Sequence, residues 1–321
     1  MQLKKSKPIR NALTSATCTL LGTQVHDAVA FGTDTPWESD NAILYYSEYQ
    51  RVTAIEPVFN ARKELDSNEF LNLRLVVDVL TGASATGAVP MPFAQTFTTP
   101  SGESTYTIGA NDTPLDPSFK DIRAALSAAW EKSMTRTLRA VYGGYLSREY
   151  DYTSLGGSAA FSRDTEDKNR TLTASIAFSY DLVSPIGGTP VELSAMPASG
   201  PKQTSGKDDT KTVVDFLIGV TQILDRQSLL QLNYNIVSRS GYLTDPYKIL
   251  SVVDDNTGLL VNTNPYRFEA RPNDRVSQSV YAKYVHQFTE DVIYLTYRYF
   301  WDDWDIHSNT IDIRYRYELG G

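Results

Sequence analysis

The sequence predicts an all-β fold, an antiparallel transmembrane barrel of the outer-membrane kind. Three observations predict it. Apolar and polar residues alternate with a period of two along much of the chain, and the connections between these segments are short and long in turn. Charged residues also recur in mid-segment on the face opposite the apolar one. Since no run of about 18 apolar residues occurs, a membrane-spanning helix is not expected.

The clearest strand is predicted at 310–319, where Ile, Tyr and Leu alternate with Thr, Asp, Arg and Glu. Segments 171–182 and 70–80 alternate in the same way. Less regular strands are predicted at 53–65, 137–146, 154–162, 213–223, 229–237, 276–287 and 292–300.

Segment 119–134 fits two patterns. Its apolar residues fall at helical spacing, and its Ala, Lys and Glu residues favour a helix. The same segment also fits a strand, with Ile122, Leu126 and Trp130 on one face. Short and long connections alternate without exception only when 119–131 is counted as a strand, so we predict a strand here.

The connections fall into two classes. Short polar turns are predicted at 66–69, 132–135, 163–169, 225–227 and 289–291. Longer connections are predicted at 81–120, 147–153, 183–211, 238–275 and 301–309. Short turns at one end and long loops at the other are typical of outer-membrane barrels. The connections 81–120 and 238–275 exceed what closing a turn requires, so we expect at least one to fold back and constrict the pore.

A soluble β-sandwich is the alternative to a barrel, because its strands also alternate. A sandwich need not sort its loops by length, however, and it buries a continuous core of large residues. Polar residues at mid-strand favour a wet lumen instead. The predicted lumen-facing residues are Arg74, Asp78, Arg139, Asp215, Gln231, Asn233, Lys283, Arg298, Asp312, Arg314 and Arg316.

Residues 1–30 are predicted to be a signal peptide. Four basic residues precede a short, mildly apolar stretch that ends at Ala28-Val29-Ala30. The alternative is a disordered basic tail. Cys18 lies inside this leader, which would leave a mature chain without cysteine. We therefore expect 31–321 to form a single barrel domain in the outer membrane of a Gram-negative bacterium. The net charge of −8 argues against a nucleic-acid partner.

Several short phrases carry a family resemblance. They are Tyr45–Glu48 with Arg51-Val52 and Glu56-Pro57, Asp78–Ser84, Arg148–Tyr152, Gly241–Lys248, and Tyr297–Tyr299 followed by Asp303-Trp304. In these phrases the chain resembles the family catalogued as domain of unknown function 3570, outer-membrane β-barrel proteins of proteobacteria. The resemblance implies a barrel and supplies no catalytic residues.

The number of strands is open at this point. Residues 53–319 supply eleven predicted strands, and single-chain bacterial barrels have an even number. Either 41–50 adds a strand or it lies in the lumen. The chain ends in Gly320-Gly321 without a terminal aromatic residue, which leads us to expect a barrel that is incomplete at its C-terminus.

Signals for an enzyme are weak. Only His286 and His307 follow the leader, and His307 with Ser308 is the one candidate for a hydrolase site at the membrane boundary. A polar loop residue is the favoured interpretation of His307. No nucleophile elbow, phosphate-binding loop or zinc spacing occurs in the sequence, so we expect no catalytic residues and no cofactor.

Two acidic loops are weak candidates for a calcium site. Asp302, Asp303 and Asp305 lie in one, and Asp254 and Asp255 in the other. Neither has the spacing of an EF-hand, so solvated acidic loops are favoured and no metal is expected.

Three functional classes compete. The first is a channel or transporter in which lumenal charges bias the passage of small solutes. The second is a plugged barrel that serves as a scaffold for periplasmic or surface partner proteins, and the third is an outer-membrane hydrolase. A barrel of this kind also implies outer-membrane lipid and the barrel-assembly machinery as partners.

Overall fold

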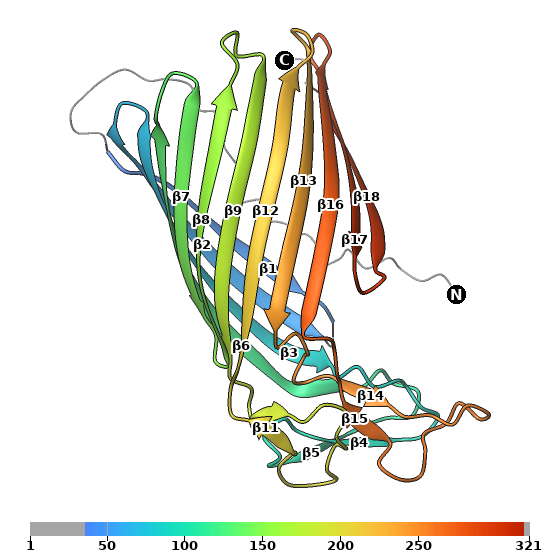
Figure 1. Cartoon of the computed structure of the whole chain (residues 1–321). Coiled ribbons are helices and arrows are strands. Elements are labelled where there is room, and N and C mark those ends of the chain that lie inside the picture. Colours follow the sequence, from blue (N-terminus) through green and yellow to red (C-terminus); the bar gives the residue numbers. More distant parts are fainter. Residues whose placement is uncertain (1–35, 50, 318–321) are drawn as a thin grey trace. The chain divides into compact units, whose positions relative to one another are not determined.

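The computed structural model describes residues 36–49 and 51–317, and all regular elements in this part of the chain are strands (Figure 1). The expected signal peptide and Cys18 lie outside the described residues. No helix long and apolar enough to cross a membrane occurs within the described residues.

Twelve strands form one large sheet in which every neighbouring pair is antiparallel. In order across the sheet they are β1 (Glu38–Ser47), β2 (Val52–Asp66), β3 (Glu69–Ala85), β6 (Leu115–Ser133), β7 (Leu138–Arg148), β8 (Tyr152–Asp164), β9 (Arg170–Val183), β12 (Asp209–Ile223), β13 (Ser228–Gly241), β16 (Asp274–Gln287), β17 (Val292–Asp302) and β18 (His307–Arg316).

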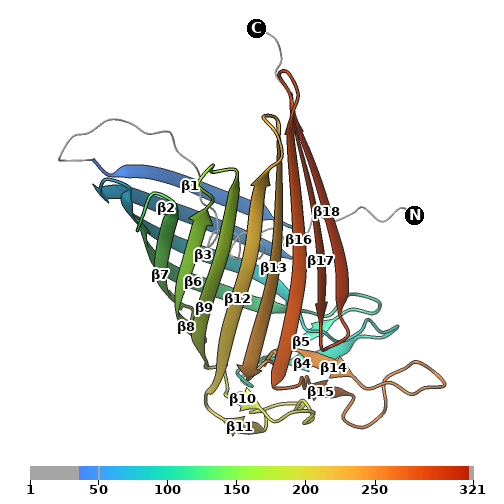
Figure 2. The same cartoon turned by 45° about the horizontal axis from the view of Figure 1, so that its top comes forward.

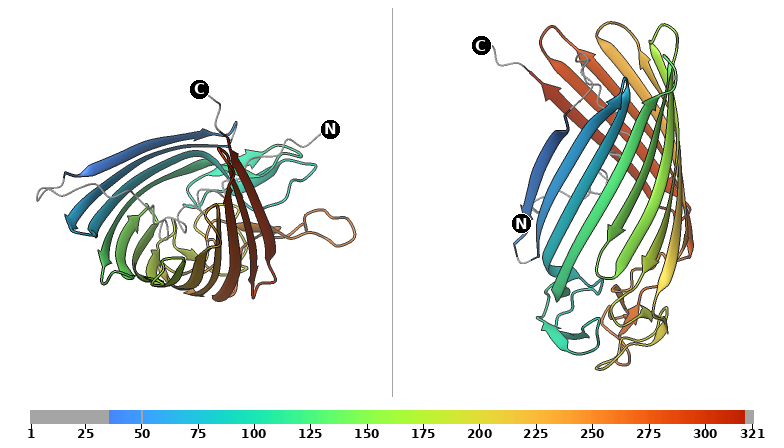
Figure 3. Two further views of the ribbon diagram at one scale, coloured as in Figure 1. Left: turned by 90° about the horizontal axis from the view of Figure 1, so that it is seen from above. Right: turned by 90° about the vertical axis from the view of Figure 1, so that its left-hand side faces the viewer.

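The sheet curls along its whole width. Viewed from one end, the strands follow an incomplete ring from β1 round to β18 (Figure 3, left). Among the described residues β1 and β18 are the two edges of the sheet, with no backbone ladder between them. This architecture is the antiparallel barrel fold of outer-membrane proteins.

Residues 38–47 form the twelfth strand of this sheet. Glu38–Ser47 pairs with β2 along its full length. Of the two alternatives left open for 41–50, the structure has a strand rather than a lumenal segment.

Segment 119–134 is a strand for most of its length, although its local propensity favours a helix. It belongs to β6, which pairs with β3 on one side and with β7 on the other. The hydrogen bonds and side-chain packing that two neighbouring strands provide override the weak intrinsic preference.

Most strands are longer than predicted, reaching 19 residues in β6 and 17 in β3. A tilted strand crosses a bilayer in about ten residues, so the extra residues extend the sheet beyond the membrane. The predicted connections shorten accordingly. Residues 149–151 and 303–306 are tight turns, whereas 147–153 and 301–309 were expected to be loops.

The connections separate to opposite ends of the sheet. The turns at 67–68, 134–137, 165–169, 224–227 and 288–291 all lie at one end, the upper one in Figure 1. The three longest connections, 86–114, 184–208 and 242–273, all lie at the other end (Figure 2). We call these three connections together the cap.

The cap has a small ordered core of its own. It contains three two-stranded sheets, β4 (Gln95–Thr98) with β5 (Thr105–Ile108), β10 (Thr189–Pro190) with β11 (Thr204–Gly206), and β14 (Ile249–Ser251) with β15 (Tyr266–Phe268). Its fully buried centre is Phe97, which stacks on Tyr106 and contacts Tyr266. The Tyr266 hydroxyl donates to Gln95 Oε1 at 2.8 Å, which joins the first and third connections.

The burial pattern of the large sheet is the reverse of that in a water-soluble protein. In β9 the residues Leu172, Ile176 and Phe178 are each about half exposed, at 52%, 52% and 49%, while Asp181 is only 3% exposed. Side chains on the concave side of a curved sheet converge and shield one another. The shielded polar face is therefore the concave face, and the exposed apolar face is the convex one.

Candidate functional site

A cavity of about 460 Å³ lies at the cap end of the polar face. Its walls come from the cap-side ends of β8, β9, β12, β13 and β16, from the turn 149–151, from Trp304, and from two parts of the 242–273 connection. One of these parts is the segment Tyr242–Tyr247, which directly follows β13. We call this space the cap-end cavity.

Four cations line one part of the cavity, and three of them have a carboxylate partner. Lys211 Nζ lies 3.3 Å from Asp181, and Arg271 donates to Glu269 at 2.7 Å. Arg275 forms an ion pair with Asp302, whose side chain is fully buried.

Arg239, the fourth cation, has no carboxylate partner within ion-pair distance in the described residues. It lies directly opposite Arg275 in the β13–β16 ladder, and its Nη1 donates to Ser277 Oγ at 2.8 Å. Because two like charges side by side repel, the pairing of Arg275 with Asp302 is what allows Arg239 to occupy the neighbouring position.

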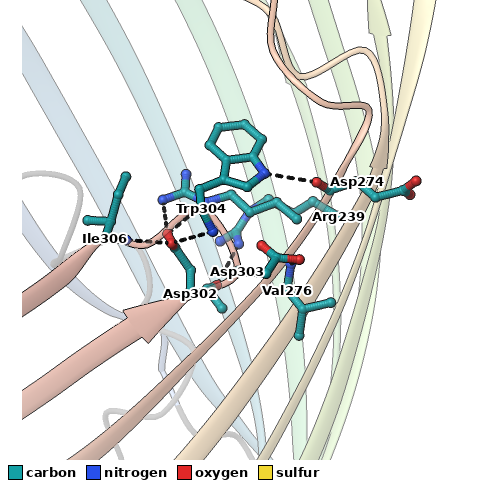
Figure 4. A network of polar contacts seen from close by, with 9 residues as sticks. Arg239, Asp274, Val276, Asp302, Asp303, Trp304 and Ile306 are labelled. Atoms are coloured by element: carbon teal, nitrogen blue, oxygen red, sulfur yellow. Dashed lines mark hydrogen bonds and ion pairs between the residues drawn. The ribbon is translucent and has the colours of Figure 1, made fainter.

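Asp302 connects this part of the cavity wall to the β17–β18 turn (Figure 4). Its Oδ1 accepts the backbone N–H groups of Trp304 at 2.9 Å and of Ile306 at 3.0 Å. The Trp304 indole donates to the carbonyl oxygen of Asp274 at 3.0 Å, and its ring lies under the Arg275 guanidinium group, 4.6 Å away. The turn therefore fixes both the arginine and the tryptophan that line the cavity.

Carboxylates line another part of the cavity, in the turn 149–151. Asp151 accepts a hydrogen bond from the Tyr247 hydroxyl, so the turn is attached to the cap. The half-buried carboxyl of Glu149 makes no direct hydrogen bond or ion pair within the described residues. Burial, and then the nearby charge of Asp121, raise the pKa of Glu149 to about 7.

Tyr242 contributes an unsatisfied donor to the cavity wall. The residue is 8% exposed, and its hydroxyl has no hydrogen-bond partner among the described residues. Burial raises the pKa of this phenol, so the hydroxyl keeps its proton at neutral pH. The hydroxyl oxygen is itself buried, so it lies within the wall and does not face the space that a solute could occupy.

The register places all eleven residues predicted to face a lumen on one face of the sheet. One row across the strands contains Gln231, Lys283 and Asp312, with Thr296 between the last two. Arg74 lies in the row that ends at Arg239 and Arg275, and Asp78 lies opposite Arg123, which donates to it. None of the eleven lines the cap-end cavity.

The residues that do line the cavity were not among the predicted ones, although two signals pointed toward them. Arg239 and Arg275 continue the alternation of β13 and β16 beyond the predicted ends of those strands. In addition, three phrases that carry the family resemblance contribute lining residues: Arg148–Tyr152, Gly241–Lys248 and Asp303-Trp304. Segments far apart in sequence thus meet around one space.

Around His307 the described residues do not form the site that the hydrolase hypothesis requires. His307 and Ser308 are consecutive strand residues and therefore point to opposite faces, and His307 Nδ1 lies 3.1 Å from the Tyr299 hydroxyl. His286 does contact a serine, with Nδ1 2.9 Å from Ser228 Oγ. Ser228 is only 6% exposed, however, and this contact joins β13 to β16 beside the turn 224–227.

The three aspartates named as weak candidates for a metal site do not form one among the described residues. The Asp302 carboxylate pairs with Arg275 and accepts two backbone N–H groups. Asp303 accepts the backbone N–H of Val276 at 3.0 Å (Figure 4). Within the described residues no group of three or more His, Cys, Asp or Glu side chains is placed to hold a metal ion.

The fold and this polar face define the class of protein, an outer-membrane β-barrel. The chain belongs to the family of proteins of unknown function DUF3570, whose model matches residues 10–321. No curated protein matches the sequence.

Three solved outer-membrane proteins are similar to the chain in fold. The outer membrane transporter YddB from Escherichia coli is 10% identical with a TM-score of 0.35, and the match covers 84% of this chain and 36% of YddB. The NanC porin is 11% identical with a TM-score of 0.32, covering 88% of this chain and 98% of NanC. A loop L8 deletion mutant of OmpT, an outer membrane protein of Vibrio cholerae, is 11% identical with a TM-score of 0.36 and the same coverage.

Proposed function

We propose that this protein is a channel or transporter for small polar solutes in the outer membrane of a Gram-negative bacterium, with the polar concave face as the solute path. The observation that carries the proposal is the inverted burial of the large sheet. Half-exposed Leu172, Ile176 and Phe178 suit contact with lipid, whereas shielded charges such as Asp181 need water or ionic partners on the other side.

The cap-end cavity is the proposed point of selection along this path. It is lined by charged groups of both signs, and the segment Tyr242–Tyr247 forms part of its wall. In outer-membrane barrels the long connections face the exterior and the short turns face the periplasm. The cavity would then be the first site that an incoming solute meets.

Conductance of the full-length protein tests this proposal. We expect the refolded protein to produce discrete single-channel steps in a planar bilayer in KCl. An Arg239→Glu variant should shift the reversal potential toward cation selectivity, because the charge at the cavity changes by two units. The matched control is Arg136→Glu, since Arg136 lies in a turn at the opposite end of the sheet and pairs with Glu166. Conductance indistinguishable from the bare bilayer would contradict the proposal.

A scaffold for partner proteins is the second candidate, and the ordered cap favours it. A cap with a fully buried Phe97 and hydrogen bonds between its connections presents a fixed surface rather than mobile loops. The same recording separates the two candidates, because a plugged scaffold inserts into the bilayer without conducting.

A further inference from the structure

Two charged groups in the wall of the cap-end cavity lack the partner that their chemistry calls for. Arg239 is a cation without a carboxylate in ion-pair distance, and Glu149 is a carboxylate without a direct donor. Both line the same space of about 460 Å³. These statements hold for the described residues.

The other cations of the wall each have a carboxylate partner: Lys211 has Asp181, Arg271 has Glu269, and Arg275 has Asp302. Asp151 and Asp245 keep their charge, but each already accepts a hydrogen bond within the wall, Asp151 from the Tyr247 hydroxyl and Asp245 Oδ1 from the backbone N–H of Tyr247. Among the described lining residues, Arg239 is therefore the available cation, without an ion-pair partner, and Glu149 is the available acid, which accepts no hydrogen bond.

The available cation and the available acid are held at separate places. Glu149 follows β7 in the turn to β8, whereas Arg239 and Tyr242 lie at the end of β13, three strands from β8 in the order of the sheet. Three strand spacings correspond to roughly 14 Å between backbones, a gap that two long side chains narrow to the size of a small solute. A volume of about 460 Å³ lies within the roughly 300–1,000 Å³ typical of small-molecule sites.

From this arrangement we propose that the cavity selects small zwitterions that carry one carboxylate and one ammonium group, the amino-acid class of solute. The carboxylate accepts hydrogen bonds from the Arg239 guanidinium group, and the ammonium group donates to Glu149. A simple anion leaves Glu149 unpaired, and a simple cation leaves Arg239 unpaired. A solute with both charges satisfies both groups at once.

This inference rests on the proposed channel function and adds the class of solute. Its test is swelling of liposomes that contain the full-length protein, in isotonic L-alanine or in isotonic lactamide. Lactamide has nearly the size of alanine but no charge. We expect L-alanine to enter roughly tenfold faster than lactamide, because a charge-assisted hydrogen bond changes an equilibrium by at least about that factor.

Two variants connect the preference to the cavity. Arg239→Gln and Glu149→Gln should each bring the ratio of L-alanine to lactamide entry close to one. The controls Arg136→Gln and Glu166→Gln remove a charge pair at the opposite end of the sheet and should keep the wild-type ratio. Heat-modifiable migration of each variant on gels checks that it is folded.

The possible results separate the two claims. Equal entry of L-alanine and lactamide into wild-type liposomes, with both faster than into protein-free liposomes, would overturn the zwitterion inference and leave the channel standing. A preference that survives in both Arg239→Gln and Glu149→Gln would also overturn the assignment to this cavity. Entry of neither solute above the protein-free rate would overturn the proposed function itself.

Discussion

At the scale of single residues, Asp302 holds together three strands at the cap end. Its buried carboxylate pairs with Arg275 of β16 and accepts two backbone N–H groups of the turn that leads into β18. Removing one partner of a buried ion pair leaves the other charge uncompensated, which makes such residues costly to replace.

We therefore expect Asp302→Asn to lower the free energy of unfolding by roughly 3–5 kcal/mol. Asp303→Asn is the matched control, because exposed Asp303 accepts only one backbone N–H and its loss should cost about 1 kcal/mol or less. Urea unfolding of both variants in detergent micelles measures the difference. Equal stability of the two variants would show that the Asp302 ion pair does not stabilise the turn.

Glu149 should make the free energy of unfolding of the protein depend on pH. Its pKa is raised from 4.5 to about 7 in the folded protein, so the folded state holds the proton more tightly than the unfolded chain. The free energy of unfolding should consequently fall as the pH rises from 4.5 to 7 and stay level above that range, as far as this group is concerned.

The comparison of wild type with Glu149→Gln isolates this contribution. Glutamine does not titrate, so the difference in unfolding free energy between variant and wild type should grow from pH 5 to pH 7 in favour of the variant. Unfolding curves in urea at several pH values measure it. A difference that does not change with pH would mean that the Glu149 carboxyl titrates as it does in the unfolded chain.

Residue patterns predict the polar face well and the cavity poorly, for a physical reason. Charges such as Arg298 and Asp312 stand out because the apolar neighbours on either side make the alternation obvious. Arg239 and Arg275 continue the polar face at the cap-side ends of β13 and β16. Their neighbours on the opposite face include Ser238, Ser240 and Asp274, so apolar residues do not mark the alternation there as clearly as in mid-strand.

At the scale of elements, β6 shows what decides between helix and strand. Its central residues favour a helix locally, yet they pair with β3 and β7 over most of their length. Both periodicities fit the segment, and the alternation of short and long connections was the sequence signal that decided for the strand. Topology, which is a property of the whole sheet, therefore carried more information than local propensity.

The cap is the element that the sequence could not predict. Its arrangement depends on contacts between segments far apart in the chain, such as Val89 N to Ser251 Oγ at 3.1 Å and Met196 N to the Tyr266 carbonyl at 2.9 Å. No periodicity within a single connection encodes such contacts. Only the unusual length of the connections indicated that they have structure of their own.

Phe97→Ala should open the cap without unfolding the sheet. Truncating a buried phenylalanine costs about 3–5 kcal/mol, a loss that falls on the small core around Tyr106 and Tyr266. Limited proteolysis should then cut within the cap while the unfolding midpoint of the barrel stays the same. Phe93→Ala, at a position that is 43% exposed, is the control and should remain resistant. Equal sensitivity of the two variants would show that the cap has no cooperative core.

At the scale of the whole molecule, the two faces of the large sheet meet two different solvents. The convex face carries apolar side chains that would be an aggregation surface in water, and the concave face carries charges that lipid could not solvate. A single sequence rule, alternation with period two, builds both faces at once. This rule is why the barrel fold was predictable from the sequence when the solute was not.

Thiol labelling along β9 tests this central claim most directly. Single cysteines are introduced into a chain that carries Cys18→Ser, and intact outer membranes are treated with a water-soluble maleimide. The concave positions are 173, 175, 177 and 179, and the convex positions are 172, 174, 176 and 178. We predict labelling at every concave position and protection at every convex one. Labelling that does not follow this alternation, or that reverses it, would contradict the assignment of the polar face to a water-filled interior.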